Sequence, residues 1–295
     1  MDGLLVLDKP QGLTSFDVVR RVRGVVRRLG TVKKPKVGHA GTLDPFATGV
    51  LPICVGRATR LAQYLIDGDK RYRATLRLGI ATDTEDSEGQ VIEEHPWQDL
   101  QPEVVRQTIE SMVGQHMQTP PIYSAIRING RRAYDMARAG EVPQMEPRPI
   151  TIYSIDVESI DLPDVVFSVT ASKGTYIRSL CRDIGQTLKV GGHCHALRRL
   201  AAAGFEEDES HLVEPIFTAE GEFFRARLLT PLEMLRALPL VQVSEACTER
   251  LRHGQTVPWE GLPEGDSPFR VSSPAGELVC VAKRKGEAIK PERVM

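Results

Sequence analysis

The chain has 295 residues, of which 41% are hydrophobic and 26% are charged, and its formal net charge is −1. This length predicts two domains or one large one, with enough apolar residues for a substantial core. A net charge near zero excludes nucleic-acid binding that is driven by the electrostatic field of the whole protein. A nucleic-acid partner would therefore have to contact a local basic patch.

The cysteines indicate neither a disulfide framework nor a cysteine zinc site. They are odd in number, scattered, and contain no Cys-x-x-Cys pair. This usage fits a reducing cytoplasm, which is the expected location. The apolar run Leu4 to Leu7 is too short for a signal peptide and has no basic region before it. No window approaches the length of a membrane span, so no membrane association is expected.

The N-terminal segment predicts a strand followed by an amphipathic helix. Leu4 to Leu7 indicates a short buried strand that ends at Lys9 to Gly12. Thr14 or Ser15 then caps a helix that continues to about Leu29. At about 100° per residue, the valines of this helix share one arc. Five arginines occupy the opposite arc: Arg20, Arg21, Arg23, Arg27 and Arg28.

The arginine arc predicts an RNA-binding surface. Lys33, Lys34 and Lys36 follow it, and no acidic residue lies between Val18 and Val37. A merely solvated face is the alternative, but such faces usually mix both signs of charge. We therefore predict contacts with a phosphate backbone, with Arg20, Arg23 and Arg27 as the candidate residues.

The stretch Val37 to Pro52, VGHAGTLDPFATGVLP, is the strongest candidate for a functional site. It has three glycines and no regular periodicity, so it predicts a loop that another molecule can approach closely. Asp44 followed by Pro45 could simply begin a helix. A phosphate-binding loop is excluded, because Gly41 is followed by Thr42 rather than lysine.

Four further elements are expected before residue 140. Lys70 to Leu78 alternates as a half-buried strand, with Tyr72 on its apolar side. The acidic turn Asp83 to Gly89 lacks the glycine of a calcium loop and predicts a hairpin tip. Pro102 to about Met117 predicts a helix, and Asn129-Gly130 predicts a hairpin turn.

The next segment predicts two strands and a helix with functional residues at its start. The strands are Ile150 to Asp156 and Val165 to Ala171, and the second turns sharply into the helix. Tyr176 and Arg178 lie at that turn. Gly191 to His195 suggests metal ligands, but no further ligand cluster accompanies the two histidines.

The C-terminal part predicts a helix and then a small β module. Leu228 to Leu238 is the expected helix, ended by Pro239. Beyond it, strands are expected at Val241 to Val243, Phe269 to Val271 and Leu278 to Ala282. Basic residues near the C-terminus make this module a candidate accessory contact to nucleic acid.

Several long strings resemble the TruB family of pseudouridine synthases. They are LDKPQGLTS, GHAGTLDPFATGVLP, DKRYRATLRLG, TPPIYSAIRINGRRAYDMARAG, SKGTYIRSL and LRRL, in the family's order within residues 4 to 200. The last segment more weakly resembles a PUA domain. The resemblance to the family implies an α+β fold with a mixed, mainly antiparallel sheet flanked by helices. It implies a catalytic domain (1–238) followed by a PUA-like β-barrel (239–295).

The resemblance also implies roles for individual residues. Asp44 matches the family's catalytic aspartate, and Arg178 matches the arginine that pairs with it. Tyr72 matches the tyrosine that packs on the target base, and Tyr176 the tyrosine beside it. His39 matches the histidine that fills the gap left by a flipped base.

Leu197 matches a leucine lining the uridine site. The implied reaction breaks the glycosidic bond of a tRNA T-loop uridine, at position 55, and re-forms it through C5. The resemblance implies no metal, coenzyme or protein partner, and a monomer is expected. Two rivals remain: an RNA-folding protein without catalysis, and a guide-RNA-dependent enzyme of the same superfamily. The modest length favours a stand-alone enzyme.

Overall fold

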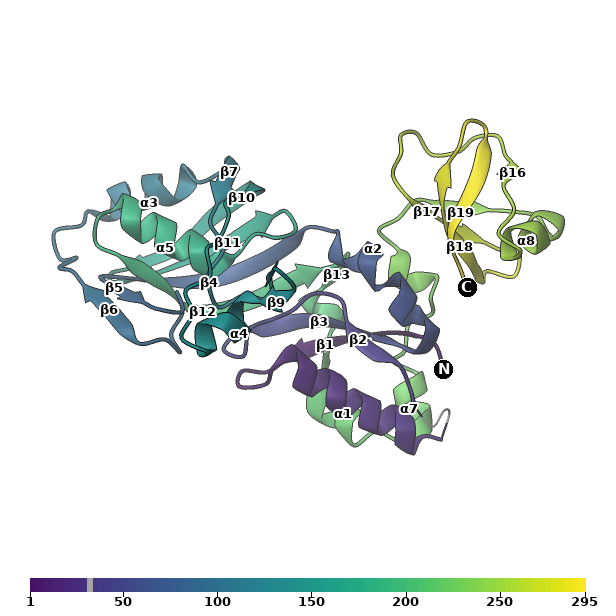
Figure 1. Ribbon diagram of the computed structural model, residues 1–295, viewed down its shortest axis with the longest axis horizontal. Coiled ribbons are helices and arrows are strands. Elements are labelled where there is room, and N and C mark those ends of the chain that lie inside the picture. The colour runs from purple at the N-terminus through teal and green to yellow at the C-terminus, as the bar shows by residue number, and fades with distance from the viewer. Residues whose placement is uncertain (31–33) are drawn as a thin grey trace.

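The computed structural model describes residues 1–30 and 34–295 and is dominated by one large mixed sheet (Figure 1). The strand order is β14-β1-β3-β12-β4-β11-β10-β7, with β2 paired to β3 and β13 paired to β12. Only β1–β14 and β3–β12 are parallel pairs among these strands. The bounds are β1 (Gly3–Lys9), β2 (Val37–His39), β3 (Thr48–Val55), β4 (Lys70–Leu78), β7 (Gly114–Gln118), β10 (Arg148–Asp161), β11 (Asp164–Ala171), β12 (Gly192–Ala202), β13 (Phe205–Glu206) and β14 (His211–Leu212).

Helices cover this sheet, which confirms the predicted α+β fold. α5 packs along β12, and α3 packs against β10 (Figure 1). The helices are α1 (Ser15–Arg28), α2 (Ala62–Ile66), α3 (Pro102–Glu110), α4 (Ala133–Arg138), α5 (Ile177–Thr187), α6 (Val213–Phe217), α7 (Gly221–Arg225) and α8 (Glu245–Arg252), with short 3-10 turns at Gly56–Leu61, Glu207–Glu209 and Glu233–Leu235.

The first helix forms as its sequence predicts. Thr14 and Asp17 make a reciprocal capping box at its N-terminus. Its valines are buried in the main core, together with apolar residues of β1 and β3. The opposite arc of arginines is therefore left facing solvent, with Arg23 half-buried. Lys33, which belongs to the predicted basic run, lies outside the described residues.

A second sheet forms the C-terminal module, in agreement with the predicted β module. Its order is β15-β17-β18-β19-β16, a curled five-stranded half-barrel with α8 alongside. The strands are β15 (Leu240–Gln242), β16 (Val257–Pro258), β17 (Phe269–Ser272), β18 (Leu278–Arg284) and β19 (Ala288–Val294). Leu278 and Val281 join an apolar cluster with Leu4 and Val6 of β1, so the module packs on the large sheet.

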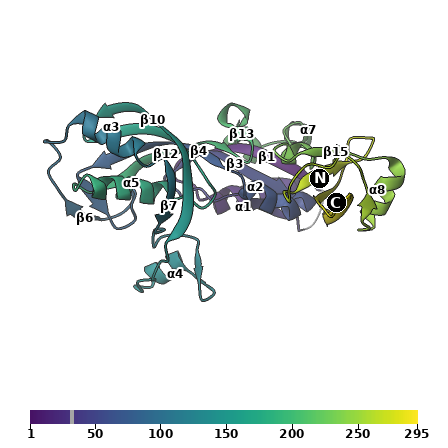
Figure 2. The ribbon, with the colours of Figure 1, turned by 90° about the horizontal axis from the view of Figure 1, so that it is seen from above.

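Among the described residues, two hairpins form two-stranded sheets of their own. β5 (Ile80–Thr82) and β6 (Val91–Glu94) flank the acidic turn, which confirms the predicted hairpin tip. β8 (Arg127–Ile128) and β9 (Arg131–Arg132) confirm the hairpin at Asn129-Gly130. The second hairpin and α4 belong to residues 119–147, here called the α4 arm, which projects away from the body of the molecule (Figure 2).

Three sequence predictions are wrong in part. The stretch 37–52 is not wholly a loop, because its two ends pair as β2 and β3, with His39 opposite Ile53. The helix at 102–117 ends at Glu110, and Gly114–Gln118 instead forms the edge strand β7. Gly114 has φ +124°, which no right-handed helix accommodates. The helix at 228–238 is only a 3-10 turn, because Leu229 exchanges two backbone hydrogen bonds with Leu4.

Candidate active site

One pocket of about 300 Å³ gathers five of the predicted site residues. Asp44 comes from the loop between β2 and β3, and Tyr72 from the central strand β4. Tyr176 and Arg178 come from the start of α5, and Leu197 from β12. Because β4 pairs with β12 and α5 packs on β12, segments more than 100 residues apart in sequence meet at this pocket.

Two groups of predicted site residues lie outside this pocket. His39 ends β2, is half-buried, and does not line the pocket. Its buried Nδ1 has no hydrogen-bond partner among the described residues, and burial lowers the pKa of its imidazole, which favours the neutral ring. Arg20, Arg23 and Arg27 line a separate hollow on α1 together with Lys34.

The Asp44 loop is held by three buried polar side chains from other segments. Lys9 Nζ donates to the carbonyl of Pro45 at 3.2 Å. Ser15 Oγ donates to the carbonyl of Leu43 at 3.0 Å and accepts from its N–H at 2.8 Å. Arg199 donates to the carbonyls of the loop residues Gly41 and Thr42, each at 3.2 Å. The carbonyls of Gly41, Thr42, Leu43 and Pro45 and the N–H of Leu43 are therefore fixed, which helps to orient the carboxylate of Asp44.

The charges around this loop are themselves desolvated. Burial lowers the pKa of Lys9 to about 8, although the nearby carboxylates of Asp44 and Glu88 act in the opposite direction. Arg199 has only 1% of its surface exposed. A guanidinium so deeply buried is stabilised by its bonds to carbonyl oxygens, and Val50 supplies another, 2.7 Å from Nε.

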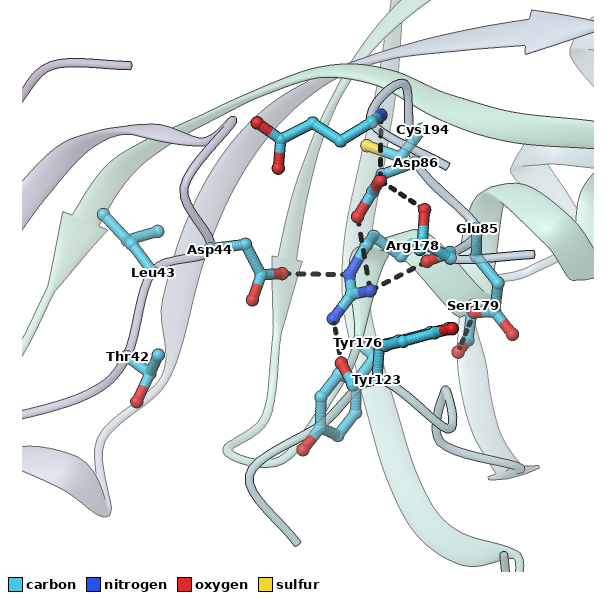
Figure 3. A network of polar contacts seen from close by, with 12 residues as sticks. Thr42, Leu43, Asp44, Glu85, Asp86, Tyr123, Tyr176, Arg178, Ser179 and Cys194 are labelled. Atoms are coloured by element: carbon cyan, nitrogen blue, oxygen red, sulfur yellow. Dashed lines mark hydrogen bonds and ion pairs between the residues drawn. The ribbon is translucent and has the colours of Figure 1, made fainter. Parts of the chain in front are cut away.

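Arg178 is the hub of the polar network beside the pocket (Figure 3). Its side chain is 4% exposed, and its Nε lies 2.9 Å from Oδ2 of Asp44. Nη1 lies 3.3 Å from Oδ2 of Asp86 and donates to the carbonyl of Thr84 at 2.8 Å. Nη2 donates to the carbonyl of Tyr123 at 2.8 Å. One guanidinium thus links Asp44 to the acidic turn, through Asp86 and Thr84, and to the α4 arm, through Tyr123.

Burial and the neighbouring guanidinium act in opposite directions on the pKa of the Asp44 carboxyl. Burial raises its pKa, Arg178 lowers it, and the like charge of Asp86 raises it again, so the net shift is upward. The side chain nevertheless keeps 34% of its surface open to the pocket. A bound substrate that covered this opening would increase the desolvation further.

Aromatic and apolar side chains complete the pocket wall. Tyr72 lies opposite Val169 of β11 and Arg199 of β12 in the sheet register. Tyr176 is fixed by two hydrogen bonds between its backbone and the side chain of Gln118. Burial raises the pKa of the Tyr176 phenol, so it stays protonated. Leu197 is 8% exposed.

Sequence reasoning missed Asp86, Lys9 and Arg199. Asp86 is 5% exposed and lies in the acidic turn that we predicted only as a hairpin tip. The dense carboxylates of that turn were a signal for a buried ionic contact. Lys9 lies two residues beyond the apolar run Leu4 to Leu7, which was a signal for a buried lysine. Arg199 lies within the LRRL string but carried no predicted role.

Among the described residues, no group of three or more histidine, cysteine or acidic side chains is placed to hold a metal ion. The same part of the chain contains no helix that is both long and apolar enough to cross a membrane.

Comparison with known families agrees with this geometry. The family model for the N-terminal domain of TruB family pseudouridylate synthases matches residues 27–177, and the model for the tRNA pseudouridylate synthase B C-terminal domain matches residues 178–235. The chain belongs to the TruB family of pseudouridylate synthases. It is therefore an isomerase that forms pseudouridine. The β module beyond residue 238 lies outside both matched regions.

Relatives and solved structures support the same assignment. A Clostridium kluyveri protein called tRNA pseudouridine synthase B is 50% identical over 72% of each chain. A Geobacter sulfurreducens protein of the same name is 42% identical over 90% of this chain and 86% of its own. A chain of a Cbf5-Nop10-Gar1 complex aligns with TM-score 0.75 and 27% identity over 99% of this chain and 84% of that chain. A chain of an H/ACA RNP bound to a substrate RNA containing 2'-deoxyuridine aligns with TM-score 0.74 and 26% identity, over 99% and 84%.

Proposed function

We propose that this TruB family enzyme converts the T-loop uridine at position 55 of tRNA to pseudouridine, without a guide RNA or a protein partner. The observation that carries the proposal is the single pocket in which Asp44 contacts Arg178 between Tyr72, Tyr176 and Leu197. The relatives named tRNA pseudouridine synthase B support tRNA as the substrate. We infer that the enzyme works as a monomer in the cytoplasm.

In the proposed reaction the uridine leaves its stack and enters the pocket. A base within a folded loop cannot be reached by a buried carboxylate, so it must be extruded. Tyr72 packs on the face of the uracil, and Leu197 lines the uridine site beside it. His39 lies outside the pocket, as a residue that fills the space vacated by the base would have to. Its neutral imidazole suits stacking on bases.

Asp44 then acts on the extruded nucleotide, either at C1′ or C6 of the uridine or by removing a sugar proton. The N1–C1′ bond breaks, the uracil rotates, and C5 bonds to C1′. The proton lost from C5 is balanced by one gained at N1, so no co-reactant is needed. Arg178 holds the carboxylate at 2.9 Å and opposes the effect of burial, which would otherwise favour its protonation. We assign removal of the C5 proton to Tyr72, which lines the same pocket as Asp44.

We further propose that residues 1–238 form the catalytic domain and residues 239–295 a PUA-like RNA-binding domain. The separate five-stranded sheet with its own apolar cluster supports this division. Basic side chains on its last strands, including Lys283, Lys290 and Arg293, are candidates for contacts to RNA outside the T-loop.

Dependence on a guide RNA is the rival to be tested, because the two solved relatives come from multi-component complexes. Purified protein is incubated with an unmodified tRNA transcript, and pseudouridine is mapped by sequencing. We expect one modification at position 55 and none in a transcript with cytidine there. Absence of modification until RNA or protein is added would contradict stand-alone action.

The arginines of α1 line two neighbouring hollows that Arg27 shares, and their other contacts allow a test of the RNA track. Arg20, Arg23 and Arg27 line the hollow with Lys34. Arg21 instead lies over the ring of Phe217 at 5.0 Å, and Arg28 donates to the carbonyls of Phe217 and Ala219. We propose that Arg20, Arg23 and Arg27 contact phosphates.

Changing Arg20, Arg23 and Arg27 together to Gln is expected to weaken tRNA binding and flatten its salt dependence. Each lost phosphate contact should reduce the slope of log K against log salt by about 0.7–0.9. The control is the double Gln variant at Arg21 and Arg28, which should change the slope less. The test is tRNA affinity measured from low to moderate salt concentration. Equal slopes for the triple variant and the unaltered protein would mean that the phosphate contacts lie elsewhere on the protein.

A further inference from the structure

A second, half-buried ion pair lies one helical turn along α5 from Arg178. Arg182 Nη1 contacts Oε1 of Glu85, and the two side chains are 22% and 13% exposed. Arg182 also pairs with Asp183, 2.7 Å away. Neither Arg182 nor Glu85 lines the active-site pocket. Because a buried ion pair is weak support for stability by itself, its position in the structure is the informative feature.

Glu85 belongs to the turn that holds Arg178. It lies between Thr84, whose carbonyl accepts from Arg178, and Asp86, whose carboxylate pairs with it. Its φ of +62° lies in the left-handed region, which residues other than glycine rarely adopt. Ser179 Oγ donates to its Oε2 at 2.7 Å, and Cys194 N–H donates to its carbonyl at 3.0 Å. These tethers keep the strained turn in place.

Arg178 and Arg182 bridge the same two segments in parallel. Four residues apart, they lie on the same face of α5. Each contacts the acidic turn, and each donates through Nη2 to a carbonyl at the start of the α4 arm. The acceptors are Tyr123 for Arg178, at 2.8 Å, and Thr119 for Arg182, at 3.0 Å. Only Arg178 also reaches Asp44.

We propose that Arg182 and Glu85 are positioning residues for catalysis, which hold the turn and the arm so that Arg178 is aimed at Asp44. Three of the four contacts of the Arg178 guanidinium are to groups on these two segments. A shift of either segment therefore moves Nε relative to the carboxylate. Misplacement of a reacting group by about 1 Å can cost about 100-fold in rate. The inference rests on the proposed role of Asp44.

The test compares Glu85→Gln, Arg182→Gln and the double variant carrying both changes. Each single variant should lower the single-turnover rate about tenfold to 100-fold, with tRNA affinity unchanged. Arg182→Gln also leaves Glu85 as a buried charge without its partner, so it should lower the thermal midpoint. The double variant removes both charges of this pair and leaves only the more exposed Asp183 without its partner, so it should regain part of the lost stability while its rate stays low. If the pair had only a structural role, the rate and the stability of the double variant would recover together.

Arg182→Lys gives a second, independent measurement if the double variant folds poorly. Lysine keeps the positive charge beside Glu85 but lacks the fork that also reaches the Thr119 carbonyl. We expect near-normal stability with a reduced rate, and a normal rate in this variant would overturn the proposal.

The matched control is Arg77→Gln, since Arg77 pairs bidentately with Asp164 on β4 and β11, away from the pocket. It should leave the rate unchanged. A normal rate in the Glu85→Gln/Arg182→Gln variant would overturn this inference alone. An inactive unaltered protein on tRNA would instead refute the proposed function.

Discussion

Asp44→Asn is expected to abolish pseudouridine formation while leaving tRNA binding within about threefold of the unaltered protein. The substitution keeps the size and polarity of the side chain but removes the negative charge that the proposed chemistry requires. A loss of more than about 1,000-fold in the single-turnover rate corresponds to about 4 kcal/mol of the barrier. Binding should persist because the proposed phosphate contacts of Arg20, Arg23 and Arg27 lie outside the pocket. Tritium release or sequencing gives the rate, and filter binding gives the affinity.

Asp164→Asn is the matched control for this experiment. Like Asp44, Asp164 pairs with an arginine and has 34% of its side chain exposed, but it lies outside the pocket. Its variant should keep full activity. Normal turnover by the Asp44 variant would refute its catalytic role. If the unaltered protein and the Asp44 variant both bound tRNA but neither formed pseudouridine, the RNA-folding hypothesis would be favoured instead.

Arg178→Lys is expected to lower the single-turnover rate about 100-fold, which corresponds to about 2.7 kcal/mol. Lysine preserves the charge but cannot serve two carboxylates and two carbonyls at once. The buried Asp86 would lose part of its pairing, so unfolding free energy should fall by about 1–3 kcal/mol. Urea denaturation measures the stability, and single-turnover kinetics measures the rate.

The same change at Arg77 separates the two effects. Arg77 makes a bidentate pair with Asp164 on the half-buried surface of the sheet. Arg77→Lys should change neither rate nor pocket geometry and should have only a small effect on stability. If Arg178→Lys lost no more activity than Arg77→Lys, the guanidinium would not be needed to orient Asp44.

Local patterns predicted the parts of the fold that local physics controls. The capping residues and valine spacing of α1, the alternation of β4 and the start of α5 near Arg178 all follow from short-range preferences. Edge strand β7 was mispredicted because its pairing with β10 is a long-range contact. The segment at 228–238 was mispredicted for the same reason, since its backbone pairs with Leu4.

The sequence by itself determined which side chains we propose for the chemistry, because Asp44, Tyr72, Tyr176, Arg178 and Leu197 lie in strings typical of the family. Only the tertiary structure decided how they are held. Asp86, Lys9 and Arg199 approach the Asp44 loop or Arg178 across long separations in the chain. A buried charge is stable only beside a partner, and the partner is chosen by how the sheet brings distant segments together. No periodicity within one segment contains that information.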